Sequence, residues 1–151
     1  MMIKKVNSVE EANYCDYLLN LLIQDEMKYN ENIKDNYVVK NWYNNLYYKS
    51  NNALFISIDN KKIVGYIYVK ITTSDNSPEK ECEALIDGLY VTFEYRRRGI
   101  ATSLINEAKR WCLEHGVKYL KLNVLSKNTS AVMLYQKENF NEFSETLIYK
   151  L

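Results

Sequence analysis

Hydrophobic positions near the start of the chain follow the spacing of a helix. A capping box of Ser8 and Glu11 opens this segment. Behind it, one helical face carries the apolar residues Val9, Ala12, Cys15, Leu18, Leu19, Leu22 and Ile23. The pattern also predicts a short strand at Ile3–Val6 and, after the polar stretch Gln24–Lys34, a second helix at Asp35–Tyr48.

The spacing of apolar residues then shortens to the period of two that is typical of strands. Leu54–Ile58 and Ile63–Ile71 predict a hairpin, joined by the polar residues 59–62. A loop follows, and then a strand is predicted over Glu83–Val91, interrupted by Gly88. A glycine inside a strand indicates a bulge or a close approach of another group to the backbone.

Helices and strands alternate in the rest of the chain. The most regular helix is predicted over Arg98–His115, with Gly116 just past its last turn. Tyr119–Val124 predicts a strand, Thr129–Glu138 a short helix and Glu145–Leu151 a last strand. A first half rich in hairpins, followed by a strand–helix–strand unit, favours one α/β domain over residues 1–151, with a mixed sheet and helices on both faces.

Composition and charge narrow the class of protein. The 151 residues include 20 Lys+Arg and 19 Asp+Glu, and a net charge of +1 argues against a broadly basic nucleic-acid binder. The first fourteen residues lack the apolar core of a signal peptide, and the longest apolar stretch, Leu18–Ile23, is too short for a membrane span. The three cysteines are widely spaced and His115 is the only histidine, so neither disulfides nor a metal site is expected. We therefore expect a cytoplasmic protein with no metal, nucleic-acid or membrane partner.

Three of the four arginines are consecutive, Arg96–Arg98, where a predicted strand turns into the most regular helix. The first N–H groups of a helix have no internal partner and the helix dipole is positive there, so this is a place for an anion. Gly99 lets the backbone approach closely, and the small Ala101 leaves room across the first turn. The residues therefore favour a cofactor with a diphosphate. A solvated basic loop at a helix start is the alternative.

The same residues resemble a known family motif. Arg96-x-x-Gly99-x-Ala101, after a strand that ends in Leu-Tyr-Val, is similar to the Q/R-x-x-G-x-G/A motif of the GNAT superfamily, N-acyltransferases that use acetyl-CoA. Further on, the segment from Asn128 to Phe140 resembles the family's N-x-x-A-x-x-x-Y-x-x-x-G-F helix. The resemblance implies a mixed, mostly antiparallel sheet of six to seven strands, splayed at the central strand pair.

The chain departs from the family pattern at three positions. The family often has proline where this chain has Phe93, and glycine where it has Arg97 and Asn139. Gly99 and Ala101 are retained, so the phosphate loop is still expected. Asparagine tolerates the left-handed backbone conformation better than most residues, so we expect a helix stop at Asn139 as well.

By this resemblance, acetyl-CoA lies along the strand and the turn that follows it. The pantetheine arm is expected beside the backbone of Leu89 and Val91, the diphosphate on the N–H groups of Arg96 to Ala101, and Asn128 at hydrogen-bonding distance of the cofactor. The full set of expected cofactor-binding residues is Leu89, Tyr90, Val91, Arg96, Arg97, Arg98, Gly99, Ile100, Ala101, Thr102, Asn128 and Tyr135.

Three residues are the candidates for catalysis. The resemblance implies that the Val91 amide polarises the thioester carbonyl and that Tyr135 lies near the sulfur of the cofactor. A tyrosine of pKa ~10 can return a proton to a thiolate of pKa ~8.5. Asp87, two residues before Leu89, is the candidate general base, and a solvent-facing strand residue is the alternative for it.

The acceptor implied by the resemblance is a primary amine, of a small molecule or of a peptide or protein terminus. It would lie against the first two helices and their connection, where acidic and aromatic residues gather. Two other functions remain open: a non-catalytic acyl-CoA or CoA-binding protein of the same fold, and a phosphate- or RNA-binding module. The chain is expected to be a monomer or a homodimer.

Overall fold

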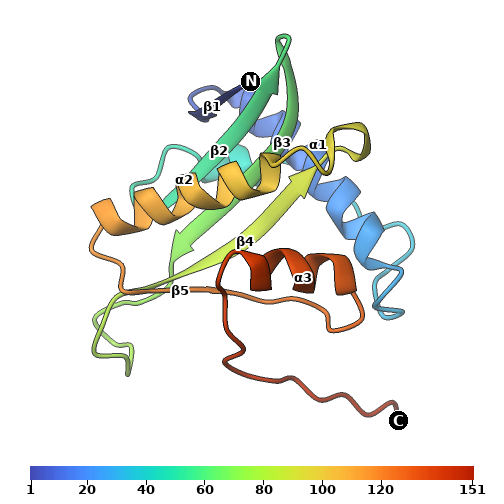
Figure 1. Cartoon of the computed structure of the whole chain (residues 1–151), viewed down its shortest axis with the longest axis vertical. Coiled ribbons are helices and arrows are strands. Elements are labelled where there is room, and N and C mark those ends of the chain that lie inside the picture. The colour runs from blue at the N-terminus through green and yellow to red at the C-terminus, as the bar shows by residue number, and fades with distance from the viewer.

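The centre of the protein is a five-stranded mixed sheet, which the computed structural model of residues 1–151 shows in the order β1-β2-β3-β4-β5 (Figure 1). The strands are β1 (Met2–Lys5), β2 (Asn52–Asp59), β3 (Lys62–Ile71), β4 (Glu83–Val91) and β5 (Tyr119–Leu122). Neighbours from β1 to β4 pair antiparallel, whereas β5 pairs parallel with β4. The predicted class, a mixed and mostly antiparallel sheet, is confirmed.

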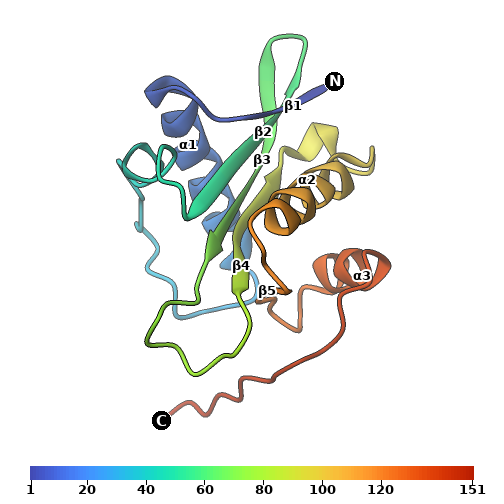
Figure 2. The ribbon, with the colours of Figure 1, turned by 90° about the vertical axis from the view of Figure 1, so that its left-hand side faces the viewer.

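Helices cover both faces of this sheet (Figure 2). They are α1 (Val9–Glu26), α2 (Ile100–Glu114) and α3 (Thr129–Lys137). Helix α1 lies on one face, and α2 and α3 lie on the other. These three helices confirm the helical segments predicted at the same places. None of them has the length and apolar character needed to cross a membrane.

The sheet is buried on both faces, and β2 shows how the sequence achieves this. Ala53 and Phe55 belong to the core cluster under α2. Leu54 and Ile56 belong to the second cluster, under α1. Successive side chains of a strand point to opposite faces, so a continuous apolar run supplies both cores.

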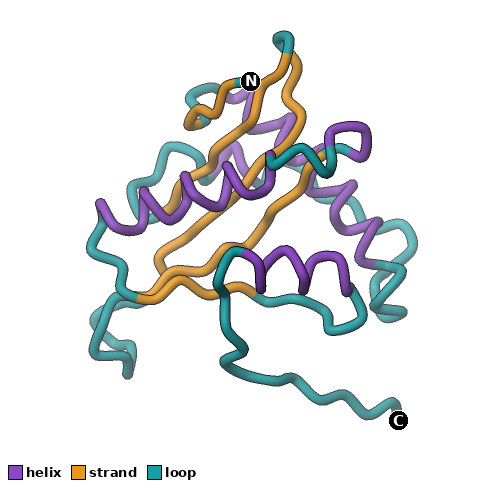
Figure 3. Tube along the Cα trace, viewed as in Figure 1, coloured by secondary structure: helices purple, strands orange, loops and turns teal.

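The second helix predicted at Asp35–Tyr48 is wrong. The structure has only a single 3-10 turn there, η1 (Tyr43–Asn45), within a long connection (Figure 3). Side chains of α1 hold the backbone of this connection instead. Asp16 accepts hydrogen bonds from the amides of Trp42 and Tyr43, at 3.2 and 3.0 Å. The Asn20 side chain accepts a hydrogen bond from the N–H of Val39 and donates one to its C=O, so both backbone groups are satisfied without a helix.

The prediction of six to seven strands, with a last strand at Glu145–Leu151, is also corrected. The sheet has five strands and ends at β5. Residues 141–151 form no strand and are exposed throughout. A strand needs a neighbour to satisfy its backbone groups, and within this chain the segment has none. We call residues 141–151 the C-terminal tail.

Candidate active site

A bulge in β4 lies at the middle of the sheet. Ile67 of β3 faces Leu89, but Val69 faces Ile86, so Asp87 and Gly88 together lie opposite one residue of β3. A Cβ atom on Gly88 would lie 2.7 Å from the Tyr66 hydroxyl oxygen, so only glycine fits there. The bulge and close approach predicted at Gly88 are both confirmed. Bulges bend a strand and redirect its side chains and backbone groups.

Beyond the bulge, β4 separates from β5. The two strands pair only over Glu83–Ile86 of β4, which leaves the last five residues of β4 without a neighbour on that side. The amide of Thr92 donates to the Val64 carbonyl of β3 at 2.9 Å. Because successive amides of a strand point to opposite sides, the amide of Val91 points away from β3, toward the slot between β4 and β5. The backbone there can pair with an extended ligand.

The turn that follows β4 presents unpaired amides. Arg97 and Gly99 both have left-handed backbones, with φ of 64° and 79°. No backbone or side-chain acceptor takes the amide hydrogens of Arg97–Thr102, and the N-cap of α2 has no side-chain cap. A Cβ atom on Gly99 would meet nothing within 4 Å, so the space before the helix is open. Such a concave run of amides at a helix start fits a diphosphate.

Arg96 differs from the two arginines that follow it. Its Nε donates to the Val91 carbonyl and its Nη2 to Asp25 Oδ2, both at 2.9 Å. Its guanidinium also lies over the Tyr90 ring, 5.1 Å from the centroid. The Arg96 side chain therefore joins β4 to the end of α1. All three arginines are exposed, and neither Arg97 nor Arg98 has an ion-pair partner. The Arg98 guanidinium lies over the Tyr95 ring, 5.0 Å from the centroid.

Thr102 and Asn128, both expected at the cofactor, make bonds within the protein. The Thr102 hydroxyl donates to Glu138 Oε1 at 2.7 Å, which joins the first turn of α2 to the residue after α3. Asn128 caps α3, its Oδ1 accepting from the amide of Ala131 at 3.2 Å. Asn139 is left-handed, with φ of 68°, just past this helix. The helix stop expected at Asn139 is confirmed.

Tyr135 lies on the inner side of α3. It packs against the core cluster under α2, and the Phe140 ring meets it edge-on at 6.0 Å. Burial raises the pKa of the Tyr135 phenol to about 12, and the negative charge of Glu26 adds to the shift. The phenol therefore keeps its proton at neutral pH, and the raised pKa makes it a weaker proton donor than an ordinary tyrosine.

Two carboxyl groups belong to this region: Asp87 lies in the bulge, and Glu26 lies within electrostatic reach of Tyr135. Asp87 is exposed and pairs with Lys70, Oδ2 to Nζ at 3.0 Å. Glu26, the last residue of α1, is partly buried. Burial raises the pKa of Glu26, and the charge of Asp87 raises it further. The charge of Glu26 thus raises the pKa of Tyr135, and the charge of Asp87 raises the pKa of Glu26. The three residues belong to α3, α1 and β4.

The predicted site residues do not include Glu26. The sequence does hold a signal for it, since Glu26 continues the apolar helical face at four residues beyond Leu22. A carboxyl group on an apolar face is rarely buried without a function or a partner. The predicted polar stretch Gln24–Lys34 leaves Glu26 outside the first helix, whereas in the structure α1 continues to Glu26.

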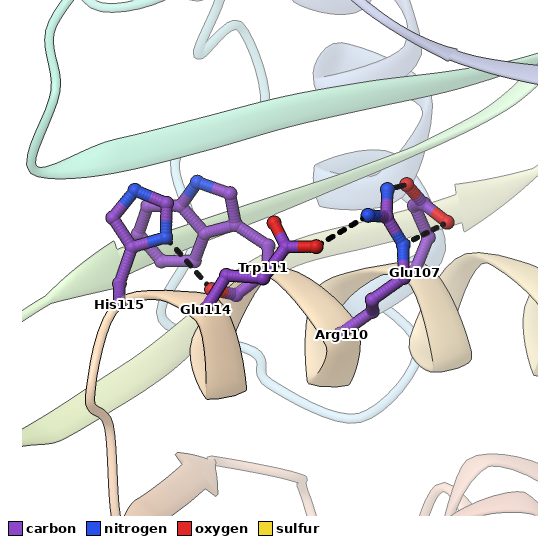
Figure 4. A network of polar contacts seen from close by, with 5 residues as sticks. All are labelled: Glu107, Arg110, Trp111, Glu114 and His115. Atoms are coloured by element: carbon purple, nitrogen blue, oxygen red, sulfur yellow. Dashed lines mark hydrogen bonds and ion pairs between the residues drawn. The ribbon is translucent and has the colours of Figure 1, made fainter.

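The far end of α2 carries the only histidine, which the sequence predicts as a helix-end residue. Figure 4 shows the His115 ring stacked on Trp111, with 4.2 Å between ring centroids. Its Nδ1 donates to the Trp111 carbonyl at 2.8 Å. Nearby, Arg110 pairs with Glu107 and Glu114 on the exposed side of the helix. His115 therefore has a structural place at the helix end. No group of three or more His, Cys, Asp or Glu side chains is arranged to hold a metal ion.

Comparison with known proteins agrees with this geometry. Residues 16–140 match the model of the "Acetyltransferase (GNAT) family". Among curated relatives, an N-alpha-acetyltransferase of Saccharolobus solfataricus is 30% identical over 95 residues, 60% of this chain and 57% of the relative. Acetyltransferase PseH of Campylobacter jejuni is 34% identical over 103 residues, 67% of this chain and 59% of the relative. The matches thus span less than two thirds of the length of these relatives.

Solved structures share the fold over the whole chain. A mutant of the BH1408 protein from Bacillus halodurans superposes with a TM-score of 0.88 at 16% identity, covering 100% of this chain and 99% of that one. The aminoglycoside N-acetyltransferase AAC(6')-Iy, in complex with CoA, gives a TM-score of 0.73 at 18% identity and covers 99% of this chain and 98% of that one. At these identities the likeness concerns the fold.

Proposed function

The chain belongs to the acetyltransferase (GNAT) family, and we propose on that premise that it transfers an acetyl group from acetyl-CoA to a primary amine. One observation carries the proposal. The free edge of β4, with the Val91 amide turned into the slot, leads directly to the unpaired amides of Arg97–Thr102. An extended arm that ends in a diphosphate needs these two surfaces in this order.

The diphosphate, the pantetheine arm and the thioester of acetyl-CoA can each be assigned to some of these residues. The amides at the start of α2 hold the diphosphate, and Arg97 and Arg98 add positive charge beside it. The backbone of Leu89 and Val91 pairs with the pantetheine arm. When bound, acetyl-CoA supplies an activated thioester for the attack of an amine. In this proposal the thioester would lie at the bulge of β4.

The protein must then stabilise charge and move protons. The Val91 amide points to where the thioester oxygen becomes negative, as a preorganised hydrogen-bond donor. An alkylamine of pKa ~10.4 is mostly protonated at neutral pH and must lose a proton before it attacks. Asp87 or Glu26 accepts that proton, directly or through water. Tyr135 keeps its own proton at neutral pH; it donates this proton to the leaving sulfur and regains one from the nitrogen that becomes the amide.

The raised pKa of Glu26 makes it a stronger base than an ordinary glutamate. Glu26 and Asp87 also give the acceptor side of the bulge a negative potential, which favours a cationic amine. Structural neighbours include aminoglycoside acetyltransferases, and the curated relatives include N-alpha-acetyltransferases. We therefore propose an amine of a small molecule or of a peptide terminus as the acceptor, and we place the reaction in the cytoplasm.

Calorimetry with acetyl-CoA, followed by a thiol-release assay over a panel of amines, tests the proposal. We expect saturable binding of acetyl-CoA and amine-dependent release of CoA. Absence of binding would refute both the transferase and a CoA-binding function. Binding without thiol release from aminoglycosides, polyamines and peptide amino termini would favour the non-catalytic CoA-binding alternative.

A further inference from the structure

Helix α3, which carries Tyr135, contains no fully buried residue. It lies on the same face of the sheet as α2 (Figure 2). Leu134 and Tyr135 pack against the core cluster under α2, but both side chains remain partly exposed. Helix α2, in contrast, buries six residues. Because apolar burial is the main source of stability, it fixes the position of α3 less firmly than that of α2.

Two hydrogen bonds join α2 to the end of α3, and both go to Glu138, the residue after the helix. The Thr102 hydroxyl donates to Glu138 Oε1 at 2.7 Å. Two turns further along α2, Lys109 Nζ donates to the Glu138 carbonyl at 3.0 Å. Thr102 and Lys109 have the i, i+7 spacing that places side chains on one side of a helix. One side of α2 therefore holds both the side chain and the backbone of Glu138.

The carboxylate of Glu138 is buried at a place where a charge needs a reason. The residue is 9% exposed, and the carboxylate forms no ion pair. Carboxylates are rarely buried without a partner, and the partner here is a hydroxyl in the first turn of α2. The positive end of the helix dipole also favours a negative charge there. A hydrogen bond to a charged group is stronger than one between neutral groups, so the bond to Thr102 restricts the end of α3.

The contacts with Glu138 reach Tyr135, which precedes it by three residues and so lies on the same side of the chain. The amide of Phe140 donates to the Tyr135 carbonyl at 2.9 Å. Lys109 Nζ also lies over the Phe140 ring, 5.3 Å from the centroid, and this ring meets the Tyr135 ring edge-on. Helix α2 therefore reaches Tyr135 both through Glu138 and through the Phe140 ring.

We propose that Glu138 is a positioning residue, which holds Tyr135 beside the thioester by bonding the end of α3 to the first turn of α2. The inference rests on the proposed acetyl transfer, in which Tyr135 is the proton donor. A displacement of about 1 Å at a reacting group can cost on the order of 100-fold in rate, so a looser α3 lowers kcat. Binding of acetyl-CoA is affected differently. Loss of a negative charge beside the unpaired amides of α2 does not weaken the binding of a diphosphate.

Two substitutions of Glu138 test its role in the thiol-release assay. Glu138→Leu keeps much of the side-chain volume but has no acceptor for the Thr102 hydroxyl, whereas Glu138→Gln keeps one. We expect kcat to fall about tenfold or more in Glu138→Leu, with no rise in the KM for acetyl-CoA, and to be restored to within about twofold of the wild type in Glu138→Gln. Glu114→Leu, at an exposed carboxyl group near the other end of α2, is the matched control and should leave kcat unchanged.

Thr102→Val removes the donor of the same hydrogen bond and gives a second, independent variant. It should lower kcat as Glu138→Leu does, and Thr102→Ser, which keeps the hydroxyl, should restore it. The double variant Thr102→Val/Glu138→Leu should lose no more than the worse single variant, because both substitutions remove one bond. Additive losses in kcat would mean that the two residues act separately and would overturn the proposal.

NMR of the protein with isotope-labelled tyrosine tests the position of Tyr135 without turnover. The edge-on Phe140 ring shifts the Tyr135 ring signals, which are identified by their absence in Tyr135→Phe. We expect these signals to move toward the values of an unstructured tyrosine in Glu138→Leu, but not in Glu138→Gln or Glu114→Leu. Unmoved signals in Glu138→Leu, an unchanged kcat, or a raised KM for acetyl-CoA in place of a lowered kcat would overturn the proposal. A wild type without thiol release would refute the proposed transfer, and the Tyr135 signals would still decide whether Glu138 holds Tyr135.

Discussion

Arg96 and Asp25 join two ends of the fold that are 71 residues apart in the chain, with 2.9 Å between Nη2 and Oδ2. The same guanidinium donates to the Val91 carbonyl, at the end of β4. Its four partners, the carboxylate, the carbonyl and the rings of Tyr90 and Phe93, surround Arg96 just before the phosphate turn. Arg96 therefore holds the turn in place, whereas Arg97 and Arg98 have no carboxylate partner and Arg98 lies over the Tyr95 ring.

The three consecutive arginines should consequently respond differently to substitution. Arg98→Ala is expected to weaken acetyl-CoA binding about tenfold, the loss of one charged hydrogen bond, and to reduce the salt dependence of binding. In a double-mutant cycle with Asp25→Asn, Arg96→Gln should show a coupling of about 0.2–1 kcal/mol in the free energy of unfolding, because the pair is exposed. Calorimetry and urea unfolding measure the two effects. Loss of salt dependence in Arg96→Gln and not in Arg98→Ala would assign the phosphate contact to Arg96.

Two glycines at the ends of α2 form a matched pair for testing the phosphate turn. Gly99 and Gly116 both have left-handed backbones, and a Cβ atom on either would meet nothing within 4 Å. Gly99→Val and Gly116→Val should therefore cost similar stability, about 1–2 kcal/mol, from backbone strain. Only Gly99→Val should also weaken acetyl-CoA binding, by at least about tenfold, because the new side chain fills the space before the helix. Equal affinities for the two variants in calorimetry would remove Gly99 from the cofactor site.

Local patterns in the sequence predict most of the fold. The strand at Lys62–Ile71, the helix at Ile100–Glu114 and the bulge at Gly88 all follow from spacing or from one residue type. The connection after α1 does not, because Asp16 and Asn20 bind its backbone across about twenty residues or more. A helical pattern cannot form helical hydrogen bonds once side chains of another element hold its amides.

The site shows the same division between local and distant effects. The turn at Arg97–Gly99 is predictable from its residues, since a helix start and a glycine lie next to each other. Glu26 and Asp87 are brought within electrostatic reach only by the packing of α1 on the sheet. The C-terminal tail is a different case, because its residues favour a strand but no strand of the sheet pairs with it.

Tyr135→Phe should lower the turnover rate and leave acetyl-CoA affinity unchanged. The substitution removes the hydroxyl group and keeps the ring that packs in the core. General acids contribute about 100-fold or more to rates, so a loss of that size in kcat is expected from thiol release. Because the pKa of Tyr135 is raised to about 12, its titration should not appear in the pH profile between pH 6 and roughly 10. Tyr47→Phe, at a partly buried tyrosine under α1, is the control, and an equal rate for both variants would exclude Tyr135 as the acid.

Glu26→Gln should lower the activity and raise the free energy of unfolding at pH 7. Glu26 has a raised pKa in the folded protein, so folding favours its protonated form. The cost of its charge is absent below the unfolded pKa of about 4.3 and is fully present once the pH exceeds the folded value. Glu26→Gln should therefore stabilise the protein at pH 7 relative to the wild type, and this difference should disappear as the pH falls toward 4.

The activity of the same variant identifies the base. If Glu26 accepts the proton of the amine, kcat/KM of the wild type rises with pH through the raised pKa of Glu26, and Glu26→Gln loses that rise along with about 100-fold or more in rate. Asp87→Asn is the comparison, since Asp87 lies on the exposed side of the bulge and pairs with Lys70. A variant Glu26→Gln that is stabilised at pH 7 and keeps the full pH profile would leave Asp87 as the base. A loss of stability at pH 7 would contradict the placement of a charged Glu26 against Asp87.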